Sequence, residues 1–229
     1  MSQTGTLPAI EVRAGPGSTR ALLACGTVAA PLFAAVVFLQ AATRTGFDLK
    51  WHPVSLLSLG GSGWIQVANF VVTGSLYLAG GVGVRRALRG QPAGTWAPRL
   101  IGVLGGALVW AGIFSPDPYH GFPPGAPAGY TWHGLLHSLA PPLAFLAVSV
   151  ACLVFARRFW RQRRRGWLVG CLVVWLALGI PNFYQGRAWF SLALMLAAVV
   201  GWGWLSLIMA HLTTELEDET AVQDRSGPR

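Results

Sequence analysis

The sequence predicts an all-α fold: a polytopic integral membrane protein built as a six-helix bundle, with both termini in the cytoplasm. Three observations lead to this fold class. The chain is unusually apolar, it contains six apolar stretches long enough to form membrane helices, and its arginines gather in alternate connections between those stretches.

The composition excludes an ordinary soluble domain. Hydrophobic residues make up 53% of the 229 residues and charged residues only 11%, whereas soluble domains carry about 25% charged residues. The mean hydropathy is +0.51. A net charge of +9 would suggest a nucleic-acid partner if the arginines formed one basic face, but they lie in short connections between apolar stretches. We therefore predict the lipid bilayer as the environment and no nucleic-acid partner.

Each predicted helix corresponds to one apolar stretch. A hydrocarbon core of about 30 Å needs about 20 apolar residues per helix, and fewer where a helix end is buried in protein. The first stretch is expected to be a retained anchor, because no small-residue cleavage site follows it. The six stretches run from residue 21 to 42, 64 to 84, 100 to 115, 133 to 156, 166 to 181 and 188 to 211.

The distribution of positive charge predicts the orientation. Fourteen of the 17 Lys and Arg residues lie in the two tails and in the connections after the second and fourth stretches; the other three are Arg44, Lys50 and Arg187. The positive-inside rule therefore places both termini in the cytoplasm of a cell whose inner (plasma) membrane the protein crosses. Residues 1–20 and the acidic residues 212–229 are expected to be disordered cytoplasmic tails around a membrane domain of residues 21–211.

The connection after the fourth stretch holds the densest positive charge, with six arginines between Arg157 and Arg165. Two interpretations are open. The segment is a topogenic signal of the kind that cytoplasmic loops commonly carry, or it also binds anionic lipid headgroups, to which each positive charge near the surface adds about 1 kcal/mol.

Residues able to do chemistry concentrate on the side predicted to be extracytoplasmic. His52 lies in the first loop there, and Asp117 lies in a second loop whose prolines limit its flexibility. His133 and His137 stand four residues apart at the start of the fourth stretch, so both imidazoles share one helix face. Asp117, His133, His137 and His52 are therefore the candidate catalytic residues.

Three of these residues, His52, His133 and His137, are also candidate zinc ligands. A zinc site needs three or four nitrogen, oxygen or sulfur ligands. The histidine pair lacks the glutamate of the H-E-x-x-H motif, and the alternative is that both are hydrogen-bonded interfacial histidines. Bound zinc would generate a nucleophilic water; without a metal, a carboxylate and a histidine would transfer protons.

Pro141 and Pro142 follow the histidine pair and predict a kink, because a proline inside a helix leaves the carbonyl four residues earlier without its partner. Such a break indicates either a polar cavity just below His137 or a simple packing bend. Small residues at helical spacing, such as Gly102 with Gly106, are expected at close contacts between helices.

A second group of polar residues could contact a substrate. On the second stretch, Gln66, Asn69 and Thr73 form one polar stripe, which either touches a ligand or holds helices together. The last connection on the same side of the membrane contributes Arg187, which could hold an anionic group or extend to lipid headgroups. The candidate substrate-binding residues are Arg187, Gln66, Asn69, Asn182 and Tyr184.

Several short motifs occur in a fixed order along the chain. They are His52-Pro53-Val54-Ser55, Gly63-Trp64-Ile65-Gln66 with Asn69-Phe70, Asp117-Pro118, Gly121-Phe122-Pro123-Pro124-Gly125, and His133-Gly134 with His137. Together they resemble a family of prokaryotic six-helix membrane proteins catalogued as domain of unknown function 998, over roughly residues 20 to 211. The resemblance implies a six-helix integral membrane fold and supplies no activity, substrate or cofactor.

Two classes of function remain open from the sequence. One is a membrane-embedded enzyme that acts on a lipid or other apolar substrate by metal-assisted or acid–base chemistry, with the histidines converging around a pocket. The other is a non-enzymatic binding, transport or accessory protein for a small apolar ligand or a partner, with the same polar residues forming a gate or a structural network. An ion-coupled transporter is disfavoured because no acidic residue lies within the predicted spans.

Overall fold

The computed structural model describes residues 16–225 and confirms the predicted all-α, six-helix architecture. Within these residues, six helical segments are long and apolar enough to cross a membrane, so the chain has the build of a multi-pass membrane protein. The helices are α1 (Pro16–Thr43), α2 (Gly63–Ala87), α3 (Trp96–Ile113), α4 (Trp132–Ser138) continued by α5 (Ala140–Arg161), α6 (Arg165–Ala177) and α7 (Phe190–Arg225), with short 3₁₀ helices η1 (Val54–Ser58) and η2 (Ile180–Tyr184).

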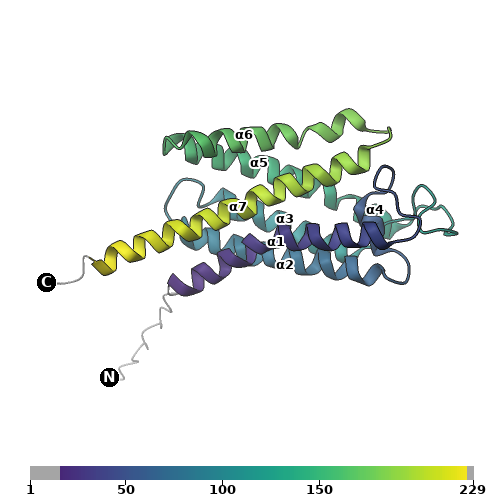
Figure 1. Ribbon diagram of the computed structural model, residues 1–229, viewed down its shortest axis with the longest axis horizontal. Coiled ribbons are helices and arrows are strands. Elements are labelled where there is room, and N and C mark those ends of the chain that lie inside the picture. The colour runs from purple at the N-terminus through teal and green to yellow at the C-terminus, as the bar shows by residue number, and fades with distance from the viewer. Residues whose placement is uncertain (1–15, 226–229) are drawn as a thin grey trace, which may run out of the picture.

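The helices form an elongated bundle with connections at two ends (Figure 1). We call one end the loop end; it carries residues 44–62, 114–131 and 178–189. The arginine end carries residues 88–95 and 162–164, and α1 begins and α7 ends there. Each membrane-length helix packs on the next one along the chain, and α7 returns to pack on α1. The bundle is therefore a closed ring in chain order.

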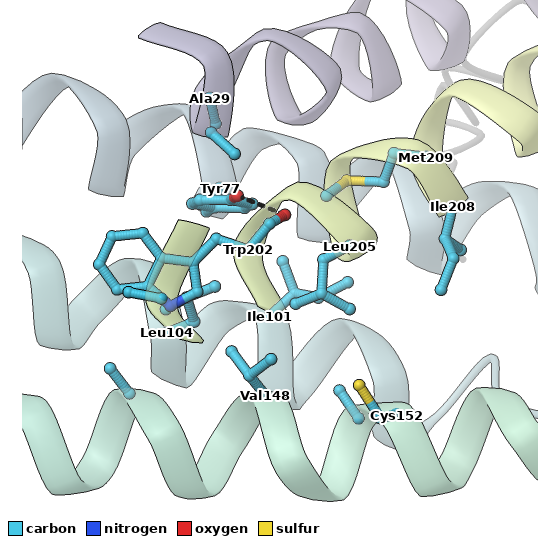
Figure 2. Packing of buried hydrophobic residues seen from close by; sticks show 14 of the residues in the cluster. Ala29, Tyr77, Ile101, Leu104, Val148, Cys152, Trp202, Leu205, Ile208 and Met209 are labelled. Carbon is cyan, nitrogen blue, oxygen red and sulfur yellow. Dashed lines mark hydrogen bonds between the residues drawn. The ribbon is translucent and has the colours of Figure 1, made fainter. Parts of the chain in front are cut away.

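A buried polar contact joins α2 to α7 inside this ring. The hydroxyl of Tyr77, which is 0% exposed, donates a hydrogen bond of 2.9 Å to the carbonyl oxygen of Trp202 (Figure 2). It also lies 3.2 Å from Ser206 Oγ. Ser206 Oγ donates in turn to the carbonyl of Gly26 on α1 at 2.7 Å. Lipid tails are as apolar as the side chains, so polar bonds of this kind and close packing hold membrane helices together.

A close contact between α2 and α3 occurs at other glycines than Gly102 and Gly106. A Cβ on Gly74 of α2 would lie 2.5 Å from the carbonyl oxygen of Gly105 on α3, so only glycine allows this approach. A Cβ at Gly102 or Gly106 would meet nothing within 4 Å. The expectation that Gly102 and Gly106 mediate packing is therefore wrong; their neighbour Gly105 has that role.

At the kink predicted for Pro141 and Pro142, the helix is interrupted at a single residue, Leu139, within one membrane-length segment. α4 ends at Ser138, and α5 begins at Ala140 with both prolines in its first turn. Proline is tolerated there because first-turn N–H groups have no partner within the helix.

The last helix extends past the predicted end of the membrane domain. Residues 212–229 were expected to form a disordered tail, but α7 continues to Arg225 and runs past the arginine end (Figure 1). Leu212 is buried, and Glu215 forms ion pairs with Arg164 at 2.8 Å and Arg158 at 3.7 Å. These tertiary contacts explain the difference. Residues 1–15 and 226–229 of the expected tails lie outside the described residues.

Candidate functional site

A cleft of about 950 Å³ lies at the loop end. Its walls come from α4, from the start of α5 and of α7, and from the connections that join the helices there. Most of the lining is apolar. The residues with polar side chains in it are Ser55, Asp117, Tyr119, Tyr130, Thr131, Trp132, His137, Ser138, Asn182 and Gln185.

A smaller cavity of about 80 Å³ lies among the helices next to the cleft. The two spaces adjoin, since they share the lining residues Pro53, Ser55, His137, Pro141, Phe145 and Leu194. Small and aromatic side chains form most of the remaining wall of this inner cavity: Ala107, Ala111, Ala140, Ala144 and Ala198 with Phe33, Phe70 and Trp202. The alanines leave space that longer side chains would fill, so the inner cavity is narrow and almost entirely apolar.

His137 belongs to the wall of both spaces and is only 5% exposed. Its Nδ1 lies 2.8 Å from the carbonyl oxygen of Phe114, and it must donate to that oxygen because a carbonyl can only accept. Nε2 of the neutral ring is then an acceptor, and no described residue donates to it. A buried acceptor left without a partner costs about 1–3 kcal/mol. A ligand that donates a hydrogen bond to Nε2 would remove this cost.

Asp117 also lines the cleft, but its carboxylate is engaged by the protein. It accepts hydrogen bonds from the hydroxyl of Thr131 at 2.7 Å and from the backbone N–H of Thr131 at 3.0 Å. These bonds favour the ionised form and hold the pKa of Asp117 below its ordinary value. The Thr131 hydroxyl in turn accepts from the N–H of Gly134 and caps α4. Asp117 therefore fixes the start of the helix that carries His137.

His52 links two connections of the loop end and lines neither space. It is 6% exposed. The N–H of Asp48 donates to its Nδ1 at 2.9 Å, and its Nε2 donates to the carbonyl oxygen of His120 at 3.1 Å. With both ring nitrogens bonded, His52 has no lone pair left for a metal ion.

His133 is exposed near the start of α4, one turn before His137; its ring contacts that of Trp132, and it does not line the cleft. Among residues 16–225 there is no group of three or more His, Cys, Asp or Glu side chains that could hold a metal ion. The predicted zinc ligands His52, His133 and His137 are therefore not brought together. The residues present do not fit a zinc ion.

The predicted substrate-binding residues separate into distinct places. Asn182 lines the cleft, where its side chain donates to the carbonyl of Gly179 and accepts from Gln185, each at 3.1 Å. Tyr184 lines a different groove beside α7, and Arg187 is exposed outside the cleft. Of these three, only Asn182 is near His137 in the same space.

Gln66 and Asn69 are buried where α1 packs on α2, away from both spaces. Gln66 Oε1 accepts from the side chain of Gln40 on α1 at 2.8 Å and from Asn69 at 3.3 Å. Asn69 also donates to the carbonyl of Phe33 on α1 and accepts from Thr73. The polar stripe of α2 therefore holds helices together, one of its two predicted roles.

The sequence patterns did not single out two buried residues of α7 that carry polar groups at the inner cavity. Ser191 and Trp202 of α7 line it and are 3% and 5% exposed, and the indole N–H of Trp202 has no hydrogen-bond partner among the described residues. Their separation of eleven positions corresponds to about three helical turns, so both lie on one face of α7. That spacing is the signal in the sequence that could have connected them.

Comparison with known proteins agrees with this architecture and adds no activity. No curated protein and no solved structure matches the chain. A family model described as "Protein of unknown function (DUF998)" matches residues 27–211, which extend from α1 into α7 and include the cleft, the inner cavity and all four candidate catalytic residues. The chain belongs to the DUF998 family of membrane proteins of unknown function.

Proposed function

We propose that the protein binds an amphipathic, lipid-like molecule at the loop end, with a polar group of the ligand at His137 and an apolar part in the inner cavity. The observation that carries this proposal is the buried Nε2 of His137, an acceptor without a partner in a residue that lines both spaces. An acceptor of this kind suits a ligand hydroxyl or amide N–H.

The contrast between the two spaces supports a ligand with unlike ends. The cleft offers polar groups such as Thr131, Asn182 and Gln185, whereas the inner cavity is walled mainly by alanine and aromatic side chains. Ligand sites commonly combine apolar walls with a few polar groups that fix orientation. Lipid-like molecules have this division of polarity, and a membrane supplies them.

An acid–base enzyme acting on such a molecule is the second candidate. The carbonyl of Phe114 fixes the Nδ1–H tautomer of His137 and leaves Nε2 as a potential base. Catalysis would also need a partner group, and neither Asp117 nor Ser55, which share the cleft, makes a hydrogen bond to His137 among the described contacts. Binding needs only the free acceptor on His137, which the structure supplies. Catalysis would also need a second group in contact with His137, so binding is the better supported function.

We also infer that the arginine end faces the cytoplasm. Among residues 16–225, twelve of the 15 Lys and Arg residues lie in the helix ends and connections of that end, as the positive-inside rule requires for a cytoplasmic side. The cleft then lies on the extracytoplasmic side of the membrane. The segment from Arg157 to Arg165 lies at the cytoplasmic leaflet, whose anionic headgroups attract it.

The test is the retention of lipid by full-length protein purified in a mild detergent, measured by native mass spectrometry and by extraction of the bound molecules. The key variant is His137→Asn, because an asparagine amide can still donate to the Phe114 carbonyl while Nε2 is removed. His133→Asn is the matched control at an exposed position one turn earlier in the same helix. We expect wild type and the control to retain the ligand, and His137→Asn to lose about tenfold in occupancy. Equal occupancy in all three proteins would contradict the proposal, and recovery of a converted ligand from wild type alone would favour the enzyme.

A further inference from the structure

A second hollow, of about 740 Å³, lies at the arginine end beside the turn between α5 and α6. It combines positive charge with apolar surface. Its lining consists of Arg161, Arg163 and Arg165 together with Phe159, Trp160, Leu168 and Val169. None of these residues takes part in the site at the loop end.

The three arginines of this hollow have no counter-ion in the described structure. The carboxylate that does reach this part of the chain, Glu215, is bound by Arg164 at 2.8 Å and lies 3.7 Å from Arg158. No hydrogen bond or ion pair joins the side chains of Arg161, Arg163 or Arg165 to any residue in the range 16–225. Three like charges around one hollow repel each other, so an anion bound between them would be stabilised.

The local backbone adds to this positive field. Arg165 is the first residue of α6, and Arg163 precedes it with a φ of 58°. The start of a helix carries a partial positive charge, which disfavours arginine there and favours an anion. Arg164, at the cap of α6, offers no side-chain hydrogen bond to the first N–H groups. An anion bound here would be stabilised both by the exposed arginines and by the start of α6.

The apolar part of the hollow indicates what carries that negative charge. Trp160 is 67% exposed and Val169 is 56% exposed, and Leu168 lies beside them in the lining. Exposed apolar side chains next to arginines at the end of a membrane helix match the boundary between hydrocarbon and headgroups, where tryptophan is enriched. A free inorganic anion would use the arginines and leave this surface without a partner.

We propose that the hollow is a specific site for one anionic phospholipid, whose phosphate contacts Arg161, Arg163 and Arg165 and whose acyl chain lies along Trp160 and Val169. That this lipid belongs to the cytoplasmic leaflet rests on the proposed orientation, whereas the site itself does not depend on the orientation. Such a site differs from a general attraction of the whole segment from Arg157 to Arg165 to a charged surface, because only the arginines that line the hollow contribute to it. Arg157 is exposed but lies outside the hollow, and Arg158 and Arg164 are already paired.

The experiment compares two double variants of the full chain in detergent that remove the same charge. Arg161→Gln/Arg165→Gln alters the hollow, and Arg89→Gln/Arg157→Gln alters two exposed arginines of the same end that lie outside it. Arg163 is left in place so that the turn at its positive φ is unchanged. Binding of dioctanoyl phosphatidylglycerol is measured by native mass spectrometry and by the shift in melting temperature, with dioctanoyl phosphatidylcholine and inorganic phosphate as comparison ligands.

We expect the hollow variant to lose about 30-fold in affinity for phosphatidylglycerol, since each removed charge contributes about 1 kcal/mol at a lipid surface. The outside variant should lose less than about threefold. Equal losses of affinity in both variants would mean that the lipid is held by diffuse attraction to the whole basic surface, and this would overturn the proposal. Binding of phosphatidylcholine or inorganic phosphate as tight as that of phosphatidylglycerol would overturn it as well.

Orientation is tested separately by thiol labelling of an Arg157→Cys variant in intact and lysed cells with a membrane-impermeant maleimide. The expected result is labelling only after lysis. Labelling in intact cells would overturn the proposed orientation and the leaflet assignment, whereas the detergent experiment decides on the site itself. The two failures are therefore distinguishable.

Discussion

The carboxylate of Asp117 occupies the position that a Cβ on Gly134 would take. We therefore predict that Gly134→Ala destabilises the protein by about 1–3 kcal/mol, the usual cost of an overpacked contact. In an Asp117→Ala background the obstructing group is absent, so Gly134→Ala should cost much less there. Unfolding free energies from denaturing-detergent titrations of the four proteins check this coupling. Strictly additive effects would show that Asp117 does not determine the requirement for glycine.

The same carboxylate predicts a dependence of stability on pH. The hydroxyl and the N–H of Thr131 hold the pKa of Asp117 below its ordinary value of 3.8. A lowered folded-state pKa gives stability that is fully present above the unfolded-state pKa and is lost as the pH falls through the folded-state pKa. Wild type should therefore melt above Asp117→Asn by a constant margin from about pH 5 to 7, and this margin should shrink below about pH 4. A margin independent of pH would mean that the charge does not contribute.

The contact between Gly74 and Gly105 makes a second prediction about glycine. Gly74→Ala forces α2 away from α3 and should cost about 1–3 kcal/mol in unfolding free energy. Gly106→Ala is the matched control, because its Cβ would meet nothing within 4 Å, and it should be neutral or slightly stabilising. The comparison uses the same denaturing-detergent titration. Similar costs at both positions would contradict the assignment of the close contact to Gly74.

The alanine wall of the inner cavity predicts a variant that separates ligand binding from folding. Ala144 is 3% exposed and lines the inner cavity, so Ala144→Leu should fill part of that space. We expect the ligand-free melting temperature to be maintained, because filling a cavity restores contacts that its walls lack, while ligand occupancy falls at least about tenfold. Full occupancy in a stably folded Ala144→Leu variant would place the ligand outside the inner cavity.

Hydropathy and proline positions predict the helices well. Bilayer thickness sets the length of each apolar stretch and backbone chemistry sets where a helix is interrupted, and both can be read from neighbouring residues. The six stretches recover all six spans, and Pro141 with Pro142 marks the position where α4 gives way to α5. The extension of α7 is not predictable in this way. It depends on Glu215 meeting Arg158 and Arg164, which are far away in the sequence and near only in the folded bundle.

The candidate site was predictable in position but not in composition. Sequence patterns direct attention to the loop end and to His137 and Asp117, both of which line the cleft. They cannot distinguish His52 from His137, because the difference lies in distant backbone groups. The carbonyl of His120 satisfies Nε2 of His52, whereas the Phe114 carbonyl takes Nδ1 of His137 and leaves its Nε2 unpaired.

The ring order of the helices has a consequence for how the protein is made. Because each helix packs on the one before it, the bundle can grow helix by helix as the chain enters the membrane during synthesis. Ser191, Leu194 and Trp202 of α7 form part of the inner wall, so the inner cavity does not exist until this final helix docks against α1. An incomplete chain that ends before α7 therefore has five spans and no inner cavity, so retention of the proposed ligand would mark completed assembly.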